Sequence, residues 1–262
     1  MGMAMMHGWL GAGLQRTQIM VQEPSPSDDL SASGVTLNPT AAELAARAPD
    51  IVVLAVKPQM IETVLPSLAG NVRGALVLSL MAGVPIKIMT QLLGEDAAYI
   101  RTMPNTPASI GKGMAGLYAD GQASAEQKAA AAGLLGAVGQ TVWLDSEKMI
   151  DAVTAISGSG PAYVFHLVEA LQAAGISLGL PEEISRDLAM QTIIGAAAML
   201  EEDGADAADL RRNVTSPGGT TAAALDVLMA ENGLGDLMRR AAHAAADRAQ
   251  ELAQIGADKS DD

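Results

Sequence analysis

Two runs in the first half of the chain most narrowly limit its fold: DIVVLAV at 50–56, which is β-branched and continuously apolar, and ALVLSL at 75–80, which has the pattern of another buried strand. Uninterrupted apolar strands are typical of a sheet that is covered on both faces. A third strand, AYIRTM at 98–103, is stopped by a proline, and helical patterns at 60–68 and 85–93 separate the three. Strands that alternate with short helices predict a doubly wound, parallel sheet.

Shorter segments extend this α/β pattern on both sides. A brief strand is predicted at 17–22 and a helix at 41–48. Two further strands are predicted at 114–118 and 141–144, around an Ala-rich helix at 125–138.

The second half of the chain reads as helical throughout. Apolar residues within 164–171 have the spacing of one helix face, and 188–200 is apolar nearly all round, which predicts a helix buried on every side. One way to bury such a helix in a small domain is against a second subunit. We therefore predict an α/β domain at 1–146 and an all-α dimerisation domain at 147–262.

Composition excludes several classes of function. The formal net charge is -14, so the chain is a poor binder of nucleic acid or anionic membranes. Without Cys it has no disulfides, thiolate zinc sites or cysteine nucleophiles, and its three His lack metal-ligand spacing, so no metal is predicted. No targeting segment is visible, and the longest uncharged apolar stretch is shorter than the roughly 20 residues that span a bilayer. We expect a cytoplasmic protein.

Two motifs follow predicted strands, where open α/β sheets bind ligands. AVKPQ (55–59) puts the cation of Lys57 at this edge, although it also suits a surface lysine before a turn. RTMPNTP (101–107) offers Asn105 and Thr106 as hydrogen-bonding groups, although it also suits an ordinary strand-ending turn.

Two more motifs lie in the helical half. The small residues of SGSGPAY (157–163) allow close approach of a ligand, or equally a helix start packed on the α/β domain. In NVTSPGGTTAAALDVL (213–228), a Pro-Gly-Gly turn precedes a helix opened by Thr220 and Thr221, with Ser216 in the same turn. Free N–H groups at a helix start bind anions, so this pattern favours a small carboxylate over simple N-capping.

Together these four motifs, in this order and spacing, resemble the pyrroline-5-carboxylate reductase family, over residues 1 to about 255. The resemblance implies NAD(P)H-dependent hydride transfer to the imine carbon of 1-pyrroline-5-carboxylate, which gives L-proline. It also implies a homodimer or a ring of dimers with interleaved helical domains. Related hydroxyacid dehydrogenases need a base, commonly a lysine on this helix, and no lysine lies on the helix after SGSGPAY, which favours imine reduction; an arginine or an acidic residue of that domain stays open as an alternative base.

The resemblance also assigns site residues. The substrate carboxylate would be held by Ser216, Gly219, Thr220 and Thr221, with the catalytic Thr221 hydroxyl near the ring nitrogen. The cofactor would contact Gly2, Ala55, Val56, Lys57, Pro58, Leu80, Met81, Ala82, Asn105 and Asn213.

The choice between NADPH and NADH stays open at this point. Glu23, which follows the strand at 17–22, is placed to accept a hydrogen bond from a ribose 2′-hydroxyl, and this would favour NADH. Ser25 and Ser27 could instead donate to a 2′-phosphate, which would favour NADPH. Glu23 and Ser25 are candidates for contact with the cofactor whichever of the two binds. The family commonly prefers NADPH, which we therefore expect.

The first residues match only the end of a dinucleotide-binding turn. Met1 and Gly2 align with the last two residues of a Gly-x-Gly-x-Met-Gly turn, and 1–14 with the helix after it. We expect the strand and first two glycines to be missing, which would leave neighbouring strands unpaired and weaken the pyrophosphate cradle. The alternatives are a truncated, catalytically impaired homologue, a non-catalytic small-acid-binding oligomer, or a related imine or hydroxyacid reductase.

Overall fold

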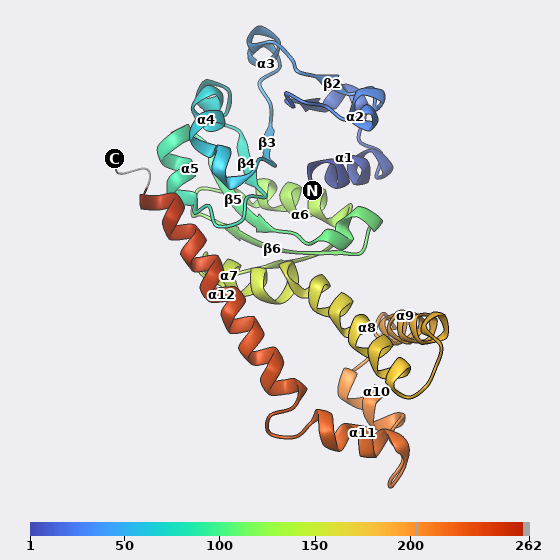
Figure 1. Cartoon of the computed structure of the whole chain (residues 1–262). Helices are drawn as coiled ribbons and strands as arrows, with labels where there is room; N and C mark the ends of the chain where they lie inside the picture. The colour runs from blue at the N-terminus through green and yellow to red at the C-terminus, as the bar shows by residue number, and fades with distance from the viewer. Residues whose placement is uncertain (203, 259–262) are drawn as a thin grey trace. The chain divides into compact units, whose positions relative to one another are not determined.

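A five-stranded sheet in the order β3-β4-β5-β6-β7 forms the centre of the first of two compact units in the computed structural model, which describes residues 1–202 and 204–258 (Figure 1). Its strands are β3 (Ile51–Leu54), β4 (Leu76–Ser79), β5 (Ala98–Met103), β6 (Gly113–Ala119) and β7 (Gly139–Trp143). The predicted strands at 50–56, 75–80 and 98–103 are confirmed, and they pair in parallel.

The expectation of a parallel sheet throughout is wrong at one strand. β6 runs antiparallel to β5, while β7 runs parallel to β6. The connection 104–112 explains the reversal, because a parallel crossover needs about a dozen residues or more, usually including a helix. The sheet is therefore mixed.

A second, smaller sheet belongs to the same unit. It consists of β1 (Met20–Val21) and β2 (Thr36–Leu37), which pair in parallel. β1 is shorter than the strand predicted at 17–22 because a 3-10 helix occupies Arg16–Gln18. Among the described residues, β1 pairs only with β2 and β3 pairs only with β4, so each keeps one edge without a strand partner.

Helix α1 (Gly2–Gly11) packs against both sheets. Its fully buried Met5 belongs to the core of the five-stranded sheet, and the adjacent Met6 belongs to the core around Ile19 beside β1. The indole N–H of Trp9 donates to the carbonyl oxygen of Leu134 on α6 (Ala125–Gly136) at 2.8 Å. The predicted first helix is thus confirmed, although it ends three residues earlier than 1–14 suggests, and it has neighbours on two sides.

Both faces of the five-stranded sheet are covered. Val77 and Tyr99 point into one core, and Leu78 and Ile100 point into the other, as the alternation of side chains along a strand requires. The remaining helices of this unit are α2 (Asp28–Ala32), α3 (Ala41–Arg47), α4 (Ile61–Val64), α5 (Ile86–Leu93), α6 (Ala125–Gly136) and α7 (Met149–Val153). The predicted helix at 60–68 is split, because Pro66 falls within a 3-10 segment.

The second unit is entirely helical in its described residues. It contains α8 (Gly160–Ser177), α9 (Glu182–Met199), α10 (Ala207–Asn213), α11 (Thr220–Leu228) and the first part of α12 (Leu234–Asp258), up to Ala244. The two compact units divide after Ser159, because α7 packs against β5 and β6, and the domain boundary at 146 stays a prediction. No helix within the described ranges is long and apolar enough to cross a membrane.

Candidate functional site

The carboxyl end of β3 leads directly into the AVKPQ motif. Ala55 and Lys57 are exposed, whereas Val56 packs against the sheet core. The carbonyl oxygen of Lys57 accepts from the N–H of Met60 at 2.9 Å, closing the 3-10 turn that Pro58 begins. Lys57 forms no ion pair with any residue that the structure describes, so its charge is available at this edge of the sheet.

The amino end of α1 meets the same edge. A Cβ atom on Gly2 would lie 3.2 Å from the Cβ of Ala55, tighter than ordinary packing, so this contact favours glycine. No side chain caps this ten-residue helix, and the N–H groups of its first turn are left open. Uncapped N–H groups and the positive end of the helix dipole suit the phosphate groups of a dinucleotide.

Leu80, Met81 and Ala82 follow β4 beside this edge. The N–H of Leu80 donates to the carbonyl oxygen of Leu54 at 2.9 Å, which holds the two strand ends together. The side chain of Met81 is 2% exposed and belongs to the sheet core, so only its main chain is available to a ligand. Ala82 is exposed.

The side-chain amide of Asn105 is engaged in holding the protein together. Its Nδ2 donates to the carbonyl oxygen and to the Oγ of Ser157, both at 3.2 Å, and its Oδ1 accepts from the N–H of Met114 at 2.9 Å. Both ends of the amide therefore have protein partners. This gives Asn105 a structural role that the sequence prediction of cofactor contact did not include.

The SGSGPAY motif begins within a π-helical turn at Thr154–Gly158. A Cβ atom on Gly158 would lie 2.6 Å from the Cε of Met103 on β5, so glycine permits this close approach. This contact shows the close packing within the first unit that the small residues of the motif allow, and the close approach of a ligand to the motif stays a prediction.

Sequence reasoning missed a buried charge cluster next to this motif. The guanidinium of Arg101, 3% exposed on β5, lies 3.3 Å from the Oε1 of Glu147 and 3.9 Å from the Oδ1 of Asp151. Glu147 Oε1 also accepts from the N–H of Ile86, the first residue of α5, at 2.8 Å. Burial raises the pKa of Asp151, Arg101 opposes this rise, and Glu147 adds to it. An arginine inside a predicted buried strand was the available signal.

The second unit holds the predicted carboxylate-binding residues in one turn. The N–H of Gly219 donates to the carbonyl oxygen of Ser216 at 3.1 Å, and Gly218 has a positive φ of 70°. A Cβ atom on Gly219 would lie 2.5 Å from the Oγ of Ser216, so glycine lets this hydroxyl keep its position. Thr220 and Thr221 are the first two residues of α11, with Thr221 half-buried.

No side chain caps α11. Simple N-capping, the alternative interpretation of this motif, is therefore not what the structure contains. The open N–H groups, the Ser216 hydroxyl and the two threonine hydroxyls together can bind a small anion such as a carboxylate. Asn213 is exposed at the end of α10, and its contact with a cofactor stays a prediction. Within the described residues, no group of three or more His, Asp or Glu is placed to hold a metal ion.

Two family models match the chain. The model described as pyrroline-5-carboxylate reductase dimerisation matches residues 147–252, and the one described as NADP oxidoreductase, coenzyme F420-dependent, matches residues 1–83. Among solved structures, a pyrroline-5-carboxylate reductase from Coxiella burnetii is similar, with a TM-score of 0.89 and 38% identity, over 96% of this chain and 94% of that one. A pyrroline carboxylate reductase from Plasmodium falciparum with NADP bound gives a TM-score of 0.81 at 29% identity, covering 96% and 94%.

Similarity to curated proteins extends over nearly the whole chain. The pyrroline-5-carboxylate reductase of Pseudomonas aeruginosa is 42% identical over 97% of this chain and 94% of its own length. That of Haemophilus influenzae is 40% identical over 96% and 94%. The chain belongs to the pyrroline-5-carboxylate reductase family.

Proposed function

We propose that the chain is an active pyrroline-5-carboxylate reductase, which reduces the C=N bond of 1-pyrroline-5-carboxylate with NAD(P)H to give L-proline. The observation that carries this proposal is the uncapped start of α11 beside Ser216 and the two threonines. A helix start with open N–H groups is selective for an anion, and the substrate's only permanent anionic group is its carboxylate.

The substrate carboxylate accepts hydrogen bonds from the main-chain N–H groups at the start of α11 and from the hydroxyls of Ser216 and Thr220. This contact fixes the ring, and the Thr221 hydroxyl then lies next to the ring nitrogen. When bound, the reduced nicotinamide supplies the hydride that adds to the imine carbon. The π electrons of the C=N bond move onto the nitrogen, which carries the proton that Thr221 holds in place. A protonated imine is already electrophilic, so positioning contributes more than a strong base.

The residues of the first unit fit the proposed cofactor. The N–H groups of α1 after Gly2 suit the pyrophosphate, and the main chain at 55–58 and 80–82 lines the same edge of the sheet. Lys57 adds a cation there. The proposal for Asn105 is restricted to its main chain, because its amide has protein partners.

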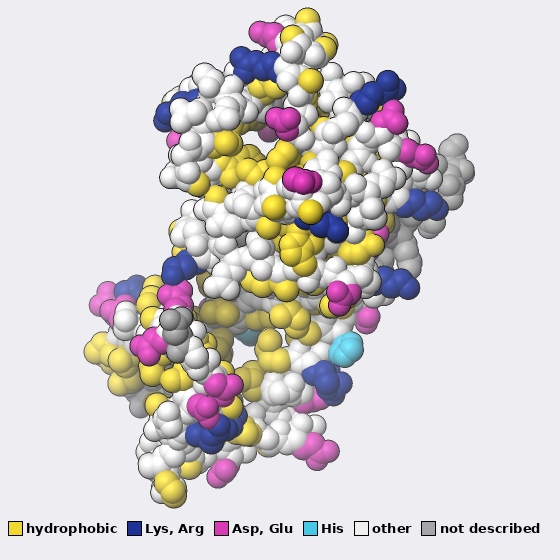
Figure 2. Space-filling view, turned by 180° about the vertical axis from the view of Figure 1, so that it is seen from behind, with side chains coloured by type: hydrophobic (Ala, Val, Ile, Leu, Met, Phe, Trp, Pro, Cys, Tyr) yellow, Lys and Arg dark blue, Asp and Glu magenta, His cyan; other side chains and the backbone are white. Residues whose placement is uncertain are grey.

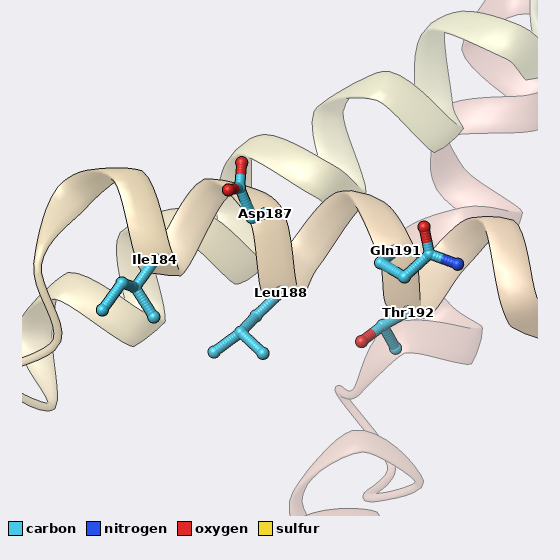
Figure 3. Close-up of a pocket in the computed structure, with 5 residues that line it drawn as sticks. All are labelled: Ile184, Asp187, Leu188, Gln191 and Thr192. Carbon is cyan, nitrogen blue, oxygen red and sulfur yellow. The ribbon is translucent and has the colours of Figure 1, made fainter.

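We further propose that the second unit joins two copies of the chain. Apolar side chains lie open over its surface (Figure 2). Leu188 and Ile194 of α9, for example, are 54% and 56% exposed. Ile184, Leu188 and Thr192 point to the same side of α9 and line a shallow pocket (Figure 3). Apolar surface of this extent is typical of an interaction site. Light scattering would give at least twice the 26.7 kDa of one chain, and a larger multiple for a ring of dimers.

Turnover tests the proposal directly. The full chain should oxidise NAD(P)H only when 1-pyrroline-5-carboxylate is present, and proline should accumulate in equal amount. Thr221→Ala should lower kcat/KM by about 10²-fold, as loss of a donor to the transition state does. Thr215→Ala is the matched control, because its hydroxyl donates to the carbonyl oxygen of Arg211 and takes no part in the proposed site.

Three outcomes would contradict parts of the proposal. Binding of small acids without turnover would indicate the non-catalytic oligomer or an impaired enzyme. Faster turnover of another imine or of a hydroxyacid would indicate a related reductase. Equal activity of Thr221→Ala and Thr215→Ala would remove Thr221 from the mechanism. That the enzyme works in the cytoplasm also stays a proposal, which cell fractionation would test.

A further inference from the structure

The carboxylate of Glu23 is held in a fixed position at the carboxyl end of β1. The N–H of Glu23 donates to the Oδ1 of Asn38 at 2.8 Å, and the Nδ2 of Asn38 donates back to the carbonyl oxygen of Glu23 at 2.9 Å. Asn38 directly follows β2 and has a positive φ of 47°, so this pair ties the ends of the two parallel strands together. The N–H of Ser25 donates to the Oε1 of Glu23 at 3.0 Å and orients the carboxylate.

The other carboxylate oxygen of Glu23 remains available. Its Oε2 accepts no hydrogen bond from the residues that the structure describes. In a dinucleotide-binding fold, an acidic side chain about 20 residues after the glycine turn accepts a hydrogen bond from the ribose 2′-hydroxyl. Glu23 stands in this position relative to Gly2.

The segment that contains Glu23 carries negative charge and no Lys or Arg. Residues 17–46 include four acidic residues and neither Lys nor Arg. Two of the four, Asp28 and Asp29, occupy the first turn of α2. A 2′-phosphate brought to Glu23 would therefore meet the like charge of this carboxylate within an acidic segment.

The two arginines that flank this segment, Arg16 and Arg47, form hydrogen bonds away from Glu23. The Nε of Arg16 donates to the carbonyl oxygen of Ser33 at 2.8 Å, and an Nη of Arg47 donates to that of Thr17 at 2.7 Å. Ser33 precedes β2 and Thr17 precedes β1, so both arginines lie at the amino ends of these strands. Glu23 and Asn38 lie at the carboxyl ends. Neither arginine is placed to neutralise a 2′-phosphate there.

The two nearby serines, Ser25 and Ser27, do not form a strong binding site for a 2′-phosphate. The Oγ of Ser27 accepts from the N–H of Leu30 at 3.2 Å as the N-cap of α2. Ser25 contributes its N–H to Glu23 rather than to a ligand. Two hydroxyls without a cation are a weak site for a dianionic phosphate, whereas an oriented carboxylate is a strong acceptor for a neutral hydroxyl.

We propose that this chain prefers NADH to NADPH, and that Glu23 is the residue that determines this specificity. The inference rests on the proposed function and departs from the NADPH preference that the family resemblance implies. Specificity here comes from one attractive and one repulsive interaction at the same carboxylate: it accepts from the 2′-hydroxyl of NADH and repels the 2′-phosphate of NADPH.

Calorimetric titration of the full chain with NADH and with NADPH measures this directly, without turnover. The expected ratio of the dissociation constants, NADPH over NADH, is at least about tenfold at low salt and falls as salt is added. Glu23→Gln keeps an acceptor for the Ser25 N–H but removes the charge, and should bring the ratio close to one. Glu95→Gln is the matched control, because it makes the same change of charge at the amino end of β5 and should leave the ratio unaltered.

Equal or tighter binding of NADPH by the native chain would overturn the inference. So would a ratio that Glu23→Gln leaves unchanged, or that Glu95→Gln lowers as much. These results would leave the proposed function intact, since a cofactor is still bound. Failure of both cofactors to bind would contradict the proposed function itself, and the inference with it.

Discussion

Replacing Arg101 with methionine should destabilise the first unit strongly. Arg101 is buried on β5, between the carboxylates of Glu147 and Asp151, whose side chains are only 29% and 15% exposed. Arg101→Met keeps much of the apolar stem but leaves both carboxylates without their cation. Breaking a buried ion pair from one side costs about 3–5 kcal/mol.

The geometry of this cluster places the expected loss of unfolding free energy for Arg101→Met near the lower end of that range. The two contacts are 3.3 and 3.9 Å long, and the Nε and Nη2 atoms of Arg101 have no hydrogen-bond partner within the described part of the chain. The native cluster is thus incompletely satisfied, so its removal forfeits less than an ideal pair would. We expect a loss of about 3 kcal/mol in the free energy of unfolding at neutral pH.

The loss should depend on pH. Burial holds the pKa of Asp151 above its ordinary value in the folded protein, and Arg101 opposes this rise, so the variant should raise it further. An acid whose pKa is raised on folding contributes stability at low pH, and this contribution is lost as the pH rises through the folded pKa. The difference between variant and native protein should therefore be smaller at pH 5 than at pH 7.5. Adding Asp151→Asn to the variant should restore part of the loss.

Tryptophan fluorescence during urea unfolding measures the stability of the first unit. Trp9 and Trp143, the only tryptophans of the chain, both belong to the first unit. Arg73→Met is the matched control, because Arg73 forms a 3.1 Å ion pair with Asp96 but is 81% exposed. Exposed pairs contribute about 0–1 kcal/mol. A loss of unfolding free energy for Arg101→Met no larger than that for Arg73→Met, or a loss that is the same at both pH values, would contradict the proposed role of the buried cluster.

Three further substitutions test packing, ionisation and assembly. Gly8→Ala places a Cβ 2.2 Å from a methyl of Val138 and should lower the free energy of unfolding by about 1–3 kcal/mol, whereas Gly11→Ala meets nothing within 4 Å and should be neutral or stabilising in thermal denaturation. Burial raises the pKa of Tyr99 to about 12, so the native fold loses stability as the pH rises from about 10 toward 12, and Tyr99→Phe should lose less in alkaline unfolding followed by circular dichroism. Leu188→Asp should reduce the mass measured by light scattering, and an unchanged mass would place the subunit interface elsewhere.

Elements with a strong local pattern were predictable from the sequence. The apolar runs of β3 and β4 are typical of strands that are covered on both faces, and both faces of this sheet are covered. The direction of β6 was not predictable from periodicity, because a strand has the same pattern in either direction. The length of the 104–112 connection contained that information.

Some features of the candidate site were likewise predictable from the local sequence, and others were not. The turn before α11 is built from neighbouring residues, so its composition alone predicted a helix start that can bind an anion. The roles of Asn105 and Arg101 depend on partners 52 and 46 residues away, Ser157 and Glu147. Nothing in the local sequence around either residue indicates which distant group will approach it.

Helix α1 combines local and long-range determinants at the edge of the sheet where we propose that the cofactor binds. Its N-terminal glycine is fixed against Ala55 after β3, while its neighbouring residues Met5 and Met6 enter two different cores. One of these cores supports the five-stranded sheet and the other supports the small sheet that ends in Glu23. The spacing between the helix start that suits the pyrophosphate and the carboxylate that suits the ribose is therefore set by the packing of α1. A substitution at Met6 should alter the discrimination between NADH and NADPH without touching either cofactor, because it moves Glu23 relative to Gly2.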